Sequence, residues 1–243
     1  MRVVGGAWRS RPLRAPAGRN TRPTSDRVRE AVFDVLGALP EAAAALDGLT
    51  AAAGLETHAA AAEPGSSGGT IGGALAGHAV LDLFAGSGAL GIEALSRGAA
   101  TCTFVESAPP ALRALRGNLE RLGVPLARGG GGERRGLPAA AGRHAVVLGT
   151  DVRRALAADA RRGARYTLVF ADPPYEAYEQ VRPALVRLLG RVLVSGAVLV
   201  VESAAGTPAG LPWAVVKEKR YGDTRVTFLV TGAASPAEGE AAD

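Results

Sequence analysis

Hydrophobic positions fall into short runs that alternate with amphipathic stretches from about residue 78 onward. Apolar or alternating runs of strand length predict strands at residues 78–84, 101–106, 145–149, 167–171, 192–202, 213–219 and 225–231. Apolar positions at helical spacing predict helices near residues 89–97, 110–122, 152–160 and 178–189. Strands that alternate with helices are typical of a doubly wound, mostly parallel α/β sheet, and the last two strands, which flank residues 220–224, predict an antiparallel final hairpin.

A glycine-rich turn joins the first predicted strand to the first predicted helix. Gly86, Gly88 and Gly91 match the pattern G-x-G-x-x-G, which brings the backbone and a helix N-terminus close to a nucleotide cofactor. Glu106 ends the next predicted strand, at the spacing expected of an acid that binds ribose hydroxyls. The pattern predicts a nucleotide-containing cofactor, and on these residues alone a nicotinamide dehydrogenase remains an alternative.

The charge of Asp82 bears on which cofactor is bound. Asp82 lies inside the predicted strand, four residues before Gly86. A carboxylate at that place repels a pyrophosphate and attracts the ammonium group of S-adenosylmethionine. We therefore expect S-adenosylmethionine. The expected contacts near the glycine turn are Asp82, Phe84, Gly86, Ser87, Gly88 and Glu106.

The motif Asp172-Pro173-Pro174-Tyr175 follows the apolar run that ends at Ala171. Methyl transfer to a planar exocyclic amine needs acceptors for both N–H protons, because the nitrogen lone pair is delocalised into the base. The Asp172 carboxylate is one such acceptor, and the Pro173 carbonyl, fixed by two prolines, is the other. The Tyr175 ring is placed to stack on an extruded base. The motif therefore predicts a methyl-transfer site, with a simple strand-closing turn as the alternative.

Positive charge is concentrated at the beginning of the chain. Residues 1–36 hold eight arginines against three acidic residues, which accounts for the whole net charge of +5. Prolines and arginines there predict an extended segment, followed by a helix at about residues 24–36 with Thr24 or Ser25 as its cap. Such a charged segment is typical of a protein that binds RNA phosphates, whereas a generally arginine-rich composition is the alternative. The expected RNA contacts are Arg9, Arg11, Arg22, Thr24, Arg27, Arg29, Lys219 and Tyr221.

Composition bears on the location of the protein and on whether it binds a metal ion. The longest apolar stretch, around residues 192–201, is about half the roughly 20 residues of a bilayer helix, and the charged beginning lacks the apolar core of a secretory signal. Cys102 is the single cysteine, and the three histidines show no ligand spacing. We therefore expect a cytoplasmic protein, a monomer, with no metal site and no membrane contact.

Changes in composition divide the chain into four parts. Residues 1–37 form the basic N-terminal arm and helix, and residues 38–77 form an Ala/Gly-rich insertion expected to be mostly loop. Residues 78–232 form the catalytic domain, and residues 233–243 form a flexible tail. A second, glycine-rich insertion interrupts the catalytic domain at residues 127–144.

Four stretches of the sequence together resemble the RsmD family. They are residues 82–97, which contain the glycine turn, the motif at residues 172–175, the opening residues 2–13, and residues 22–33. The resemblance covers most of the chain apart from about residues 38–77, 127–144 and the tail. It implies the class I S-adenosylmethionine-dependent methyltransferase fold, with a seven-stranded sheet, and methylation of the N2 amine of a guanine in 16S ribosomal RNA.

The resemblance also implies further roles for residues and partners. Asp151 and Val152 stand where this fold holds the adenine of the cofactor, although Asp151 is also a good cap for the helix that follows it. The implied substrate is an assembled or nearly assembled small ribosomal subunit. The stretch around residues 22–27 is alternatively a lid over the cofactor.

Three other functions remain possible on the sequence. A DNA or RNA adenine-N6 methyltransferase uses the same D-P-P-Y chemistry, but a DNA enzyme needs a sizeable target-recognition region that neither insertion is suited to supply. A nicotinamide dehydrogenase is disfavoured by Asp82 and leaves Asp172–Tyr175 without a task. A non-catalytic RNA-binding protein on the same fold is disfavoured by the intact motifs.

Overall fold

The structure is a computed structural model, and it describes residues 1–16, 25–39, 75–127 and 143–232. The predictions for Arg22, for Thr24, for nearly all of the two insertions and for the tail lie outside these residues. Seven strands form one sheet in the order β3-β2-β1-β4-β5-β7-β6. The strands are β1 (Ala79–Leu83), β2 (Thr101–Glu106), β3 (His144–Gly149), β4 (Tyr166–Ala171), β5 (Leu193–Ala204), β6 (Ala214–Tyr221) and β7 (Thr224–Val230).

The pairing of the strands confirms the predicted doubly wound sheet. Strands β1 to β5 pair in parallel, whereas β7 pairs antiparallel with both β5 and β6. The helices are η1 (Gly6–Trp8), α1 (Asp26–Ala38), α3 (Ala89–Ser96), α4 (Pro109–Arg121), α5 (Val152–Arg161) and α6 (Tyr175–Leu189). Each expected strand is present, and its bounds differ from the expectation by at most two residues.

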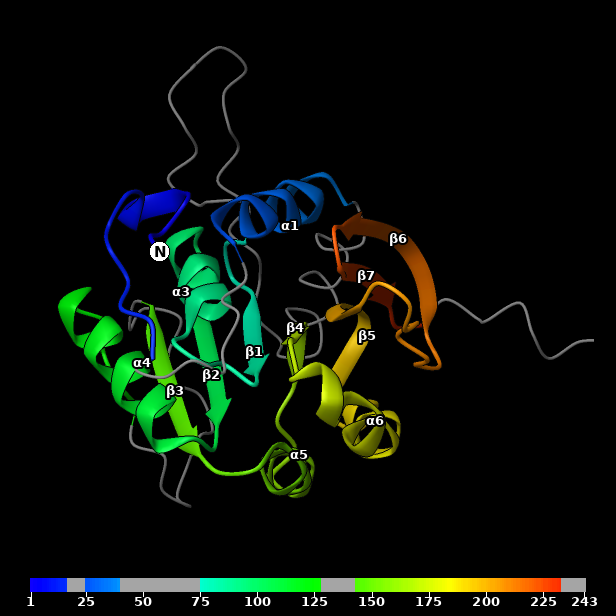
Figure 1. The fold of residues 1–243 in the computed structure, drawn as a ribbon. Coiled ribbons are helices and arrows are strands. Elements are labelled where there is room, and N and C mark those ends of the chain that lie inside the picture. Colours follow the sequence, from blue (N-terminus) through cyan, green and yellow to red (C-terminus); the bar gives the residue numbers. More distant parts are fainter. Residues whose placement is uncertain (17–24, 40–74, 128–142, 233–243) are drawn as a thin grey trace, which may run out of the picture.

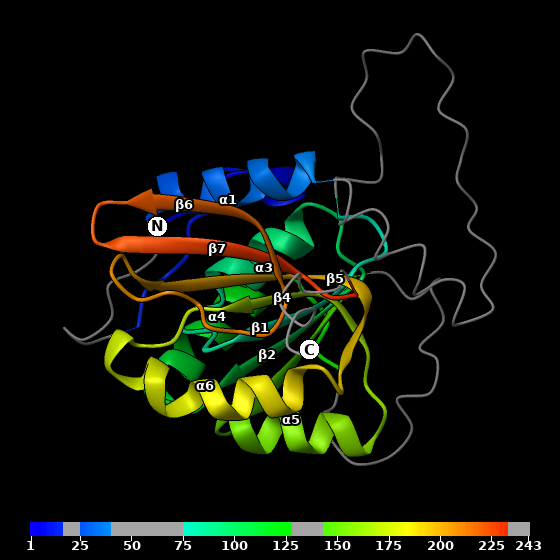
Figure 2. The same ribbon diagram turned by 90° about the vertical axis from the view of Figure 1, so that its right-hand side faces the viewer.

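Helices cover both faces of the sheet (Figures 1 and 2). One apolar cluster joins α1, α3 and α4 to side chains such as Val80 and Phe170, and a second joins α5 and α6 to the opposite face through side chains such as Leu81 and Ala171. Strands buried on both faces read as nearly continuous apolar runs because every side chain meets a helix. In β1, Asp82 is the polar exception, and it belongs to the α1 face because successive side chains alternate.

Helix α6 begins three residues earlier than its apolar pattern predicts. The buried side of the helix starts at Tyr178, but the helix itself starts at Tyr175, with Pro174 as its cap residue. Proline suits the beginning of a helix for two reasons. Its ring fixes φ near the helical value, and the N–H group that it lacks would have no partner within the helix at this position. Tyr175 and Glu176 are exposed, which is why hydrophobic spacing did not reveal the first turn.

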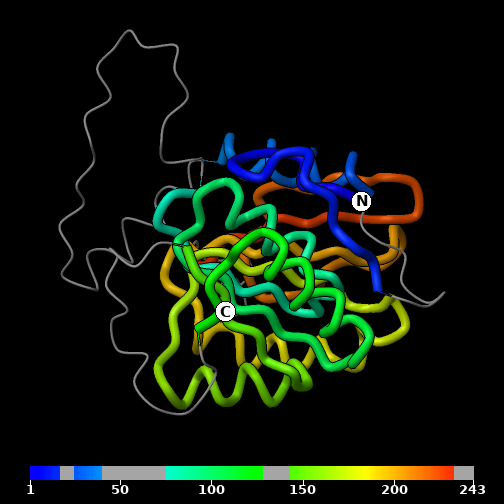
Figure 3. The backbone as a smooth tube through the Cα atoms, turned by 90° about the vertical axis from the view of Figure 1, so that its left-hand side faces the viewer, coloured from blue at the N-terminus to red at the C-terminus, as the bar shows by residue number. Residues whose placement is uncertain are grey.

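The N-terminal segment, residues 1–16, packs on the core together with α1. Val3 and Leu13 of the segment and Phe33 of α1 are buried in the α1-side cluster. The centroid of the Phe33 ring lies 5.5 Å from that of the Phe170 ring of β4. Of the two expected caps, Ser25 is the one that caps α1, and its hydroxyl accepts a hydrogen bond from the Val28 N–H at 3.2 Å. Figure 3 shows the segment in blue along the outside of the molecule, beside α1.

Within the described residues, no helix is long and apolar enough to cross a membrane.

The packing of α3 on β2 leads to a stability prediction. A Cβ on Gly91 would lie 2.3 Å from the Phe104 ring and 2.6 Å from the Cys102 sulfur. We expect Gly91→Ala to lower the free energy of unfolding by about 1–3 kcal/mol, the usual range for overpacking. The matched control is Gly117→Ala in α4, where nothing lies within 4 Å of the added Cβ. There alanine should raise stability by about 0.5–1 kcal/mol. Chemical denaturation measures both, and equal effects would contradict the packing account.

Candidate active site

The sheet register brings the predicted site residues to one edge. Leu83, the last residue of β1, pairs with Val105 of β2 and with Ala171 of β4. Phe84, Glu106 and Asp172 directly follow these three residues in the chain. The carboxyl ends of parallel strands are the usual place for a ligand in this type of sheet. The register therefore gathers at one place residues that are far apart in the sequence.

The backbone of the glycine turn adopts conformations that most residues avoid. Phe84, Gly86 and Gly88 have φ values of 61°, 55° and 84°. A left-handed non-glycine residue such as Phe84 costs about 1–2 kcal/mol and is typical of functional sites. A Cβ on Gly86 would approach nothing closer than 4.0 Å, whereas a Cβ on Gly88 would lie 2.4 Å from Leu115. Gly86 thus leaves open space above the turn, and Gly88 allows the turn to pack on α4.

Glu106 holds the glycine turn in place. One carboxylate oxygen accepts a hydrogen bond from the Gly86 N–H at 2.8 Å. The other accepts from the N–H groups of Ser107 and Ala108 at 2.7 Å, and these precede α4. Glu106 is half-buried, so its carboxylate faces both the turn and the edge of the sheet. The expected contact of Glu106 with ribose hydroxyls stays a prediction.

Asp82 lies beneath the same turn. Its side chain is buried, and Oδ2 accepts a hydrogen bond from the Gly91 N–H at 2.9 Å. Burial, with smaller contributions from the charges of Asp172 and Glu106, raises the pKa of Asp82 to about 7, although the hydrogen bond from the Gly91 N–H lowers it. Asp82 thus holds the N-terminal turn of α3 against β1, and its contact with a cofactor stays a prediction.

Asp151 caps α5, which is the role that the sequence offered as the alternative to adenine binding. Its side chain accepts from the Arg153 N–H at 2.9 Å and pairs with the Arg153 guanidinium. Arg153 keeps the pKa of Asp151 below its usual value. Val152 is buried in the cluster of the α5 face. The contact of both residues with adenine stays a prediction.

The D-P-P-Y motif spans the end of β4 and the start of α6. Asp172 is half-buried, Pro173 is buried and Tyr175 is 38% exposed. The Tyr175 hydroxyl lies 2.7 Å from the Thr224 hydroxyl at the start of β7, which ties the ring to the final hairpin. A partly exposed aromatic ring that is anchored through its hydroxyl suits stacking on a base.

The N-terminal segment docks on α3 and α4 through side chains that the sequence analysis did not single out. The Val4 N–H donates to buried Glu93 at 2.8 Å, and the Trp8 N–H donates to Ser96 at 2.9 Å. Asn118 accepts from the Arg14 N–H at 2.9 Å and donates to the carbonyls of Arg14 at 3.0 Å and of Ser87, in the glycine turn, at 2.9 Å.

The helical pattern of α4 could have identified Asn118 as a docking residue. In α4, Ala111, Leu115 and Leu119 form the buried stripe, and Asn118 lies on it. A polar residue on the apolar side of a helix must find partners, because an unpaired buried polar group costs free energy.

The prediction that Arg29 binds RNA is wrong. Its side chain has an exposed fraction of 0%, and its guanidinium donates to Asp26 at 2.8 Å and to the Arg2 carbonyl. An arginine on the buried face of α1 holds the N-terminal segment against the helix and does not reach a phosphate. Arg9, Arg11 and Arg27 are exposed, as an RNA contact requires.

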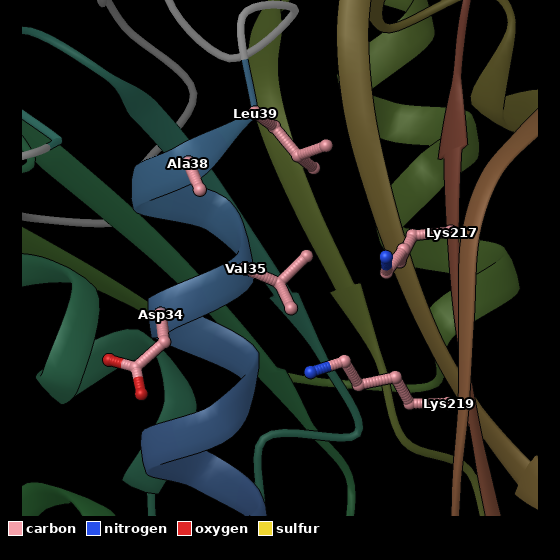
Figure 4. A pocket seen from close by; sticks show the side chains of 6 residues that line it. All are labelled: Asp34, Val35, Ala38, Leu39, Lys217 and Lys219. Atoms are coloured by element: carbon pink, nitrogen blue, oxygen red, sulfur yellow. The ribbon is translucent and has the colours of Figure 1, made fainter.

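Lys219 and Tyr221 lie on β6, and Lys219 lines a groove (Figure 4). The groove has a volume of about 330 Å³ and separates β6 from the C-terminal half of α1. Its lining comprises Asp34, Val35, Ala38, Leu39, Lys217 and Lys219. Figure 4 shows the Lys219 side chain extended from β6 toward α1. Burial raises the pKa of Tyr221, with the charge of Arg27 acting in the opposite direction. Arg27, Lys219 and Tyr221 are thus neighbours, although their role in RNA binding stays a prediction.

Among the residues that the structure describes, no three His, Cys, Asp or Glu side chains are grouped so as to hold a metal ion.

Comparison with known proteins identifies the family. The model of the family described as conserved hypothetical protein 95 matches residues 1–63 and 69–230. YlbH of Bacillus subtilis is 34% identical over 78% of this chain and 73% of its own length. Ribosomal RNA small subunit methyltransferase D of Escherichia coli is 30% identical over 72% of this chain and 60% of its own length.

Solved structures agree with the sequence relatives. The structure of yhhF from Escherichia coli is 28% identical with a TM-score of 0.63, and the match covers 95% of this chain and 97% of that one. A Thermus thermophilus structure is 25% identical with a TM-score of 0.62, covering 94% and 98% of the two chains. The match to the family model extends through the basic opening, the glycine turn and the D-P-P-Y motif. The chain therefore belongs to the RsmD family.

Proposed function

We propose that this protein transfers a methyl group from S-adenosylmethionine to the N2 amine of a guanine in 16S ribosomal RNA. The observation that carries the proposal is the position of Asp172, Pro173 and Tyr175 at the sheet edge next to the glycine turn. Membership of a family with relatives named as small-subunit ribosomal RNA methyltransferases supports it.

The residues at the sheet edge fit S-adenosylmethionine. The open side of Gly86 leaves room for a ligand above the turn, and Glu106 presents acceptor oxygens there. The negative charges of Glu106 and Asp172, and that of Asp82 above about pH 7, suit a cofactor that carries positive charge on its sulfur and its ammonium group. When bound, S-adenosylmethionine supplies a methyl group that is activated by the positive sulfur.

Asp172 and Pro173 prepare the amine that receives the methyl group. The Asp172 carboxylate and the Pro173 carbonyl accept hydrogen bonds from its two N–H groups and so orient the nitrogen lone pair. The nitrogen becomes acidic as its bond to carbon forms and the carbon–sulfur bond breaks, and the released proton passes to Asp172 or to water. Orientation and charge stabilisation, and not a strongly basic carboxylate, therefore supply the rate enhancement.

RNA recognition is the part of the proposal that concerns the basic surface. Exposed Arg9, Arg11 and Arg27 supply positive charge outside the acidic sheet edge, and Tyr175 offers its ring to a flipped base. The proposed substrate is an assembled or nearly assembled small ribosomal subunit, in the cytoplasm.

The direct test is a methylation assay with three substrates. The protein is incubated with labelled S-adenosylmethionine and unmodified small subunits, free 16S RNA or DNA, and the methylated nucleoside is identified by mass spectrometry. N2-methylguanosine from the ribosomal substrate is expected. N6-methyladenosine would replace the proposal with the adenine-N6 alternative, and no product would support a binding function alone.

The first prediction from the proposed function concerns Asp172. Asp172→Ala should lower the turnover number by about 10²–10³-fold, the usual effect of losing an aimed polar group in a transition state. Calorimetry should show nearly unchanged S-adenosylmethionine affinity, because the carboxylate is assigned to the base. A variant with near-normal turnover would remove Asp172 from the mechanism.

The second prediction concerns the pH dependence of cofactor binding. Asp82 has a pKa of about 7, so it is protonated at pH 6 and ionised at pH 8. A positively charged cofactor binds the ionised form better, and its affinity should therefore rise with pH through 7, by at most tenfold per pH unit. Asp82→Asn should bind more weakly at pH 8 and lose the dependence. A slope that persists in Asp82→Asn would assign the titration to another group.

The third prediction concerns the exposed arginines. Replacing Arg9, Arg11 and Arg27 together by Gln should raise the KM for the ribosomal substrate and leave S-adenosylmethionine affinity unchanged. The slope of log affinity against log salt for RNA should fall by up to about one unit for each lost phosphate contact. Circular dichroism checks the fold. An unchanged salt slope with weakened cofactor binding would instead favour a lid over the cofactor.

A further inference from the structure

Glu202 lies next to Asp172 at the sheet edge, and no role has been given to it so far. Ala171 of β4 pairs with Val201 of β5, so Asp172 and Glu202 follow a pair of aligned residues on adjacent strands. Adjacent strands are about 4.8 Å apart. Glu202 is half-buried.

The alternation of side chains places Glu202 on the α1 face. Val200 belongs to the α1-side cluster and Val201 to the opposite one, so Glu202 is directed to the same side as Val200. Asp172 has the same relation to Phe170, which belongs to the α1-side cluster. The two carboxylates therefore share one face and one level of the sheet.

The anchored ring of Tyr175 lies close to this pair. Thr224, which holds the Tyr175 hydroxyl at 2.7 Å, pairs with Ala204, two residues beyond Glu202 on β5. Residues two positions apart on a strand share a face and are separated by about 6.7 Å. Tyr175, Asp172 and Glu202 thus lie at the same part of the sheet edge.

The edge of guanine differs from that of adenine in the group beside the amine. Guanine has an N–H donor at N1, adjacent to the N2 amine, whereas adenine has a bare N1 acceptor adjacent to its N6 amine. A carboxylate next to the amine-binding residues accepts from the first and repels the second. Flipped bases are read through such contacts to their Watson–Crick edge.

We propose that the Glu202 carboxylate accepts a hydrogen bond from the N1–H of the target guanine, while Asp172 and Pro173 hold the N2 amine. This inference rests on the proposed function. Glu202 is then the residue that selects guanine over purines that carry an amine beside a bare ring nitrogen.

The test uses 2-aminopurine, which keeps the N2 amine and lacks the N1 hydrogen. Small subunits are reconstituted with guanine or 2-aminopurine at the position that the parent protein methylates, and kcat/KM is measured for both. The parent protein should prefer guanine by about 10–100-fold, the usual effect of a lost hydrogen bond to a charged group. Glu202→Gln should reduce this preference at least tenfold, because its amide donates to the bare N1.

Binding supplies a second readout. The affinity of each subunit for the protein, measured with S-adenosylhomocysteine present, should show the same loss of preference in Glu202→Gln. The matched control is Glu120→Gln on the exposed surface of α4, which should keep the parent preference. If Glu202→Gln fails to fold, Glu202→Asp should lower guanine turnover and keep the preference, because the carboxylate remains.

The outcomes separate the two proposals. An unchanged preference in a folded Glu202→Gln that still methylates guanine overturns the role of Glu202 and leaves the proposed function intact. A loss of preference in Glu202→Asp also overturns it. If the parent protein methylates no guanine in the subunit, the proposed function fails, and the role of Glu202 fails with it.

Discussion

Hydrogen bonds from the backbone of the glycine turn and of the first turn of α3 to two strand carboxylates, Glu106 and Asp82, organise the site. Glu106 accepts from Gly86, and Asp82 accepts from Gly91. These two contacts hold a turn that contains three residues with positive φ, including Phe84, against its conformational preferences. A carboxylate that accepts backbone N–H bonds forms stronger hydrogen bonds than a neutral acceptor, which is what such a strained turn requires. The turn is therefore preorganised before any ligand arrives.

The N-terminal segment is connected to the same turn. Asn118 binds the backbone of Arg14 on one side and the Ser87 carbonyl on the other. Glu93 and Ser96 fix the beginning of the segment to α3, which follows the turn directly. The positively charged surface and the glycine turn are thus parts of one packed unit. Arg29, buried against Asp26, contributes to that unit and not to the charged surface.

The sequence predicted the sheet because apolar patterns are local, and the structure brings Phe84, Glu106 and Asp172 of the predicted site to one edge of that sheet. Apolar runs mark strands that are buried on two faces, and the two motifs lie directly at strand ends. The start of α6 at Tyr175 was missed because its first turn has no buried side. The burial of Arg29 was missed because the charge of an arginine does not reveal which side of α1 it occupies. The alignment of Glu202 with Asp172 depends on the register between β4 and β5, which no local pattern determines.

The central claim is that cofactor and target base meet at the carboxyl edge of β1, β2 and β4. A crystal structure of the protein with S-adenosylhomocysteine tests it most directly. The account predicts the ribose within hydrogen-bond distance of Glu106, the ligand over Gly86, and the sulfur facing the side of Asp172 and Pro173. A ligand bound elsewhere, such as in the groove between α1 and β6, would contradict it.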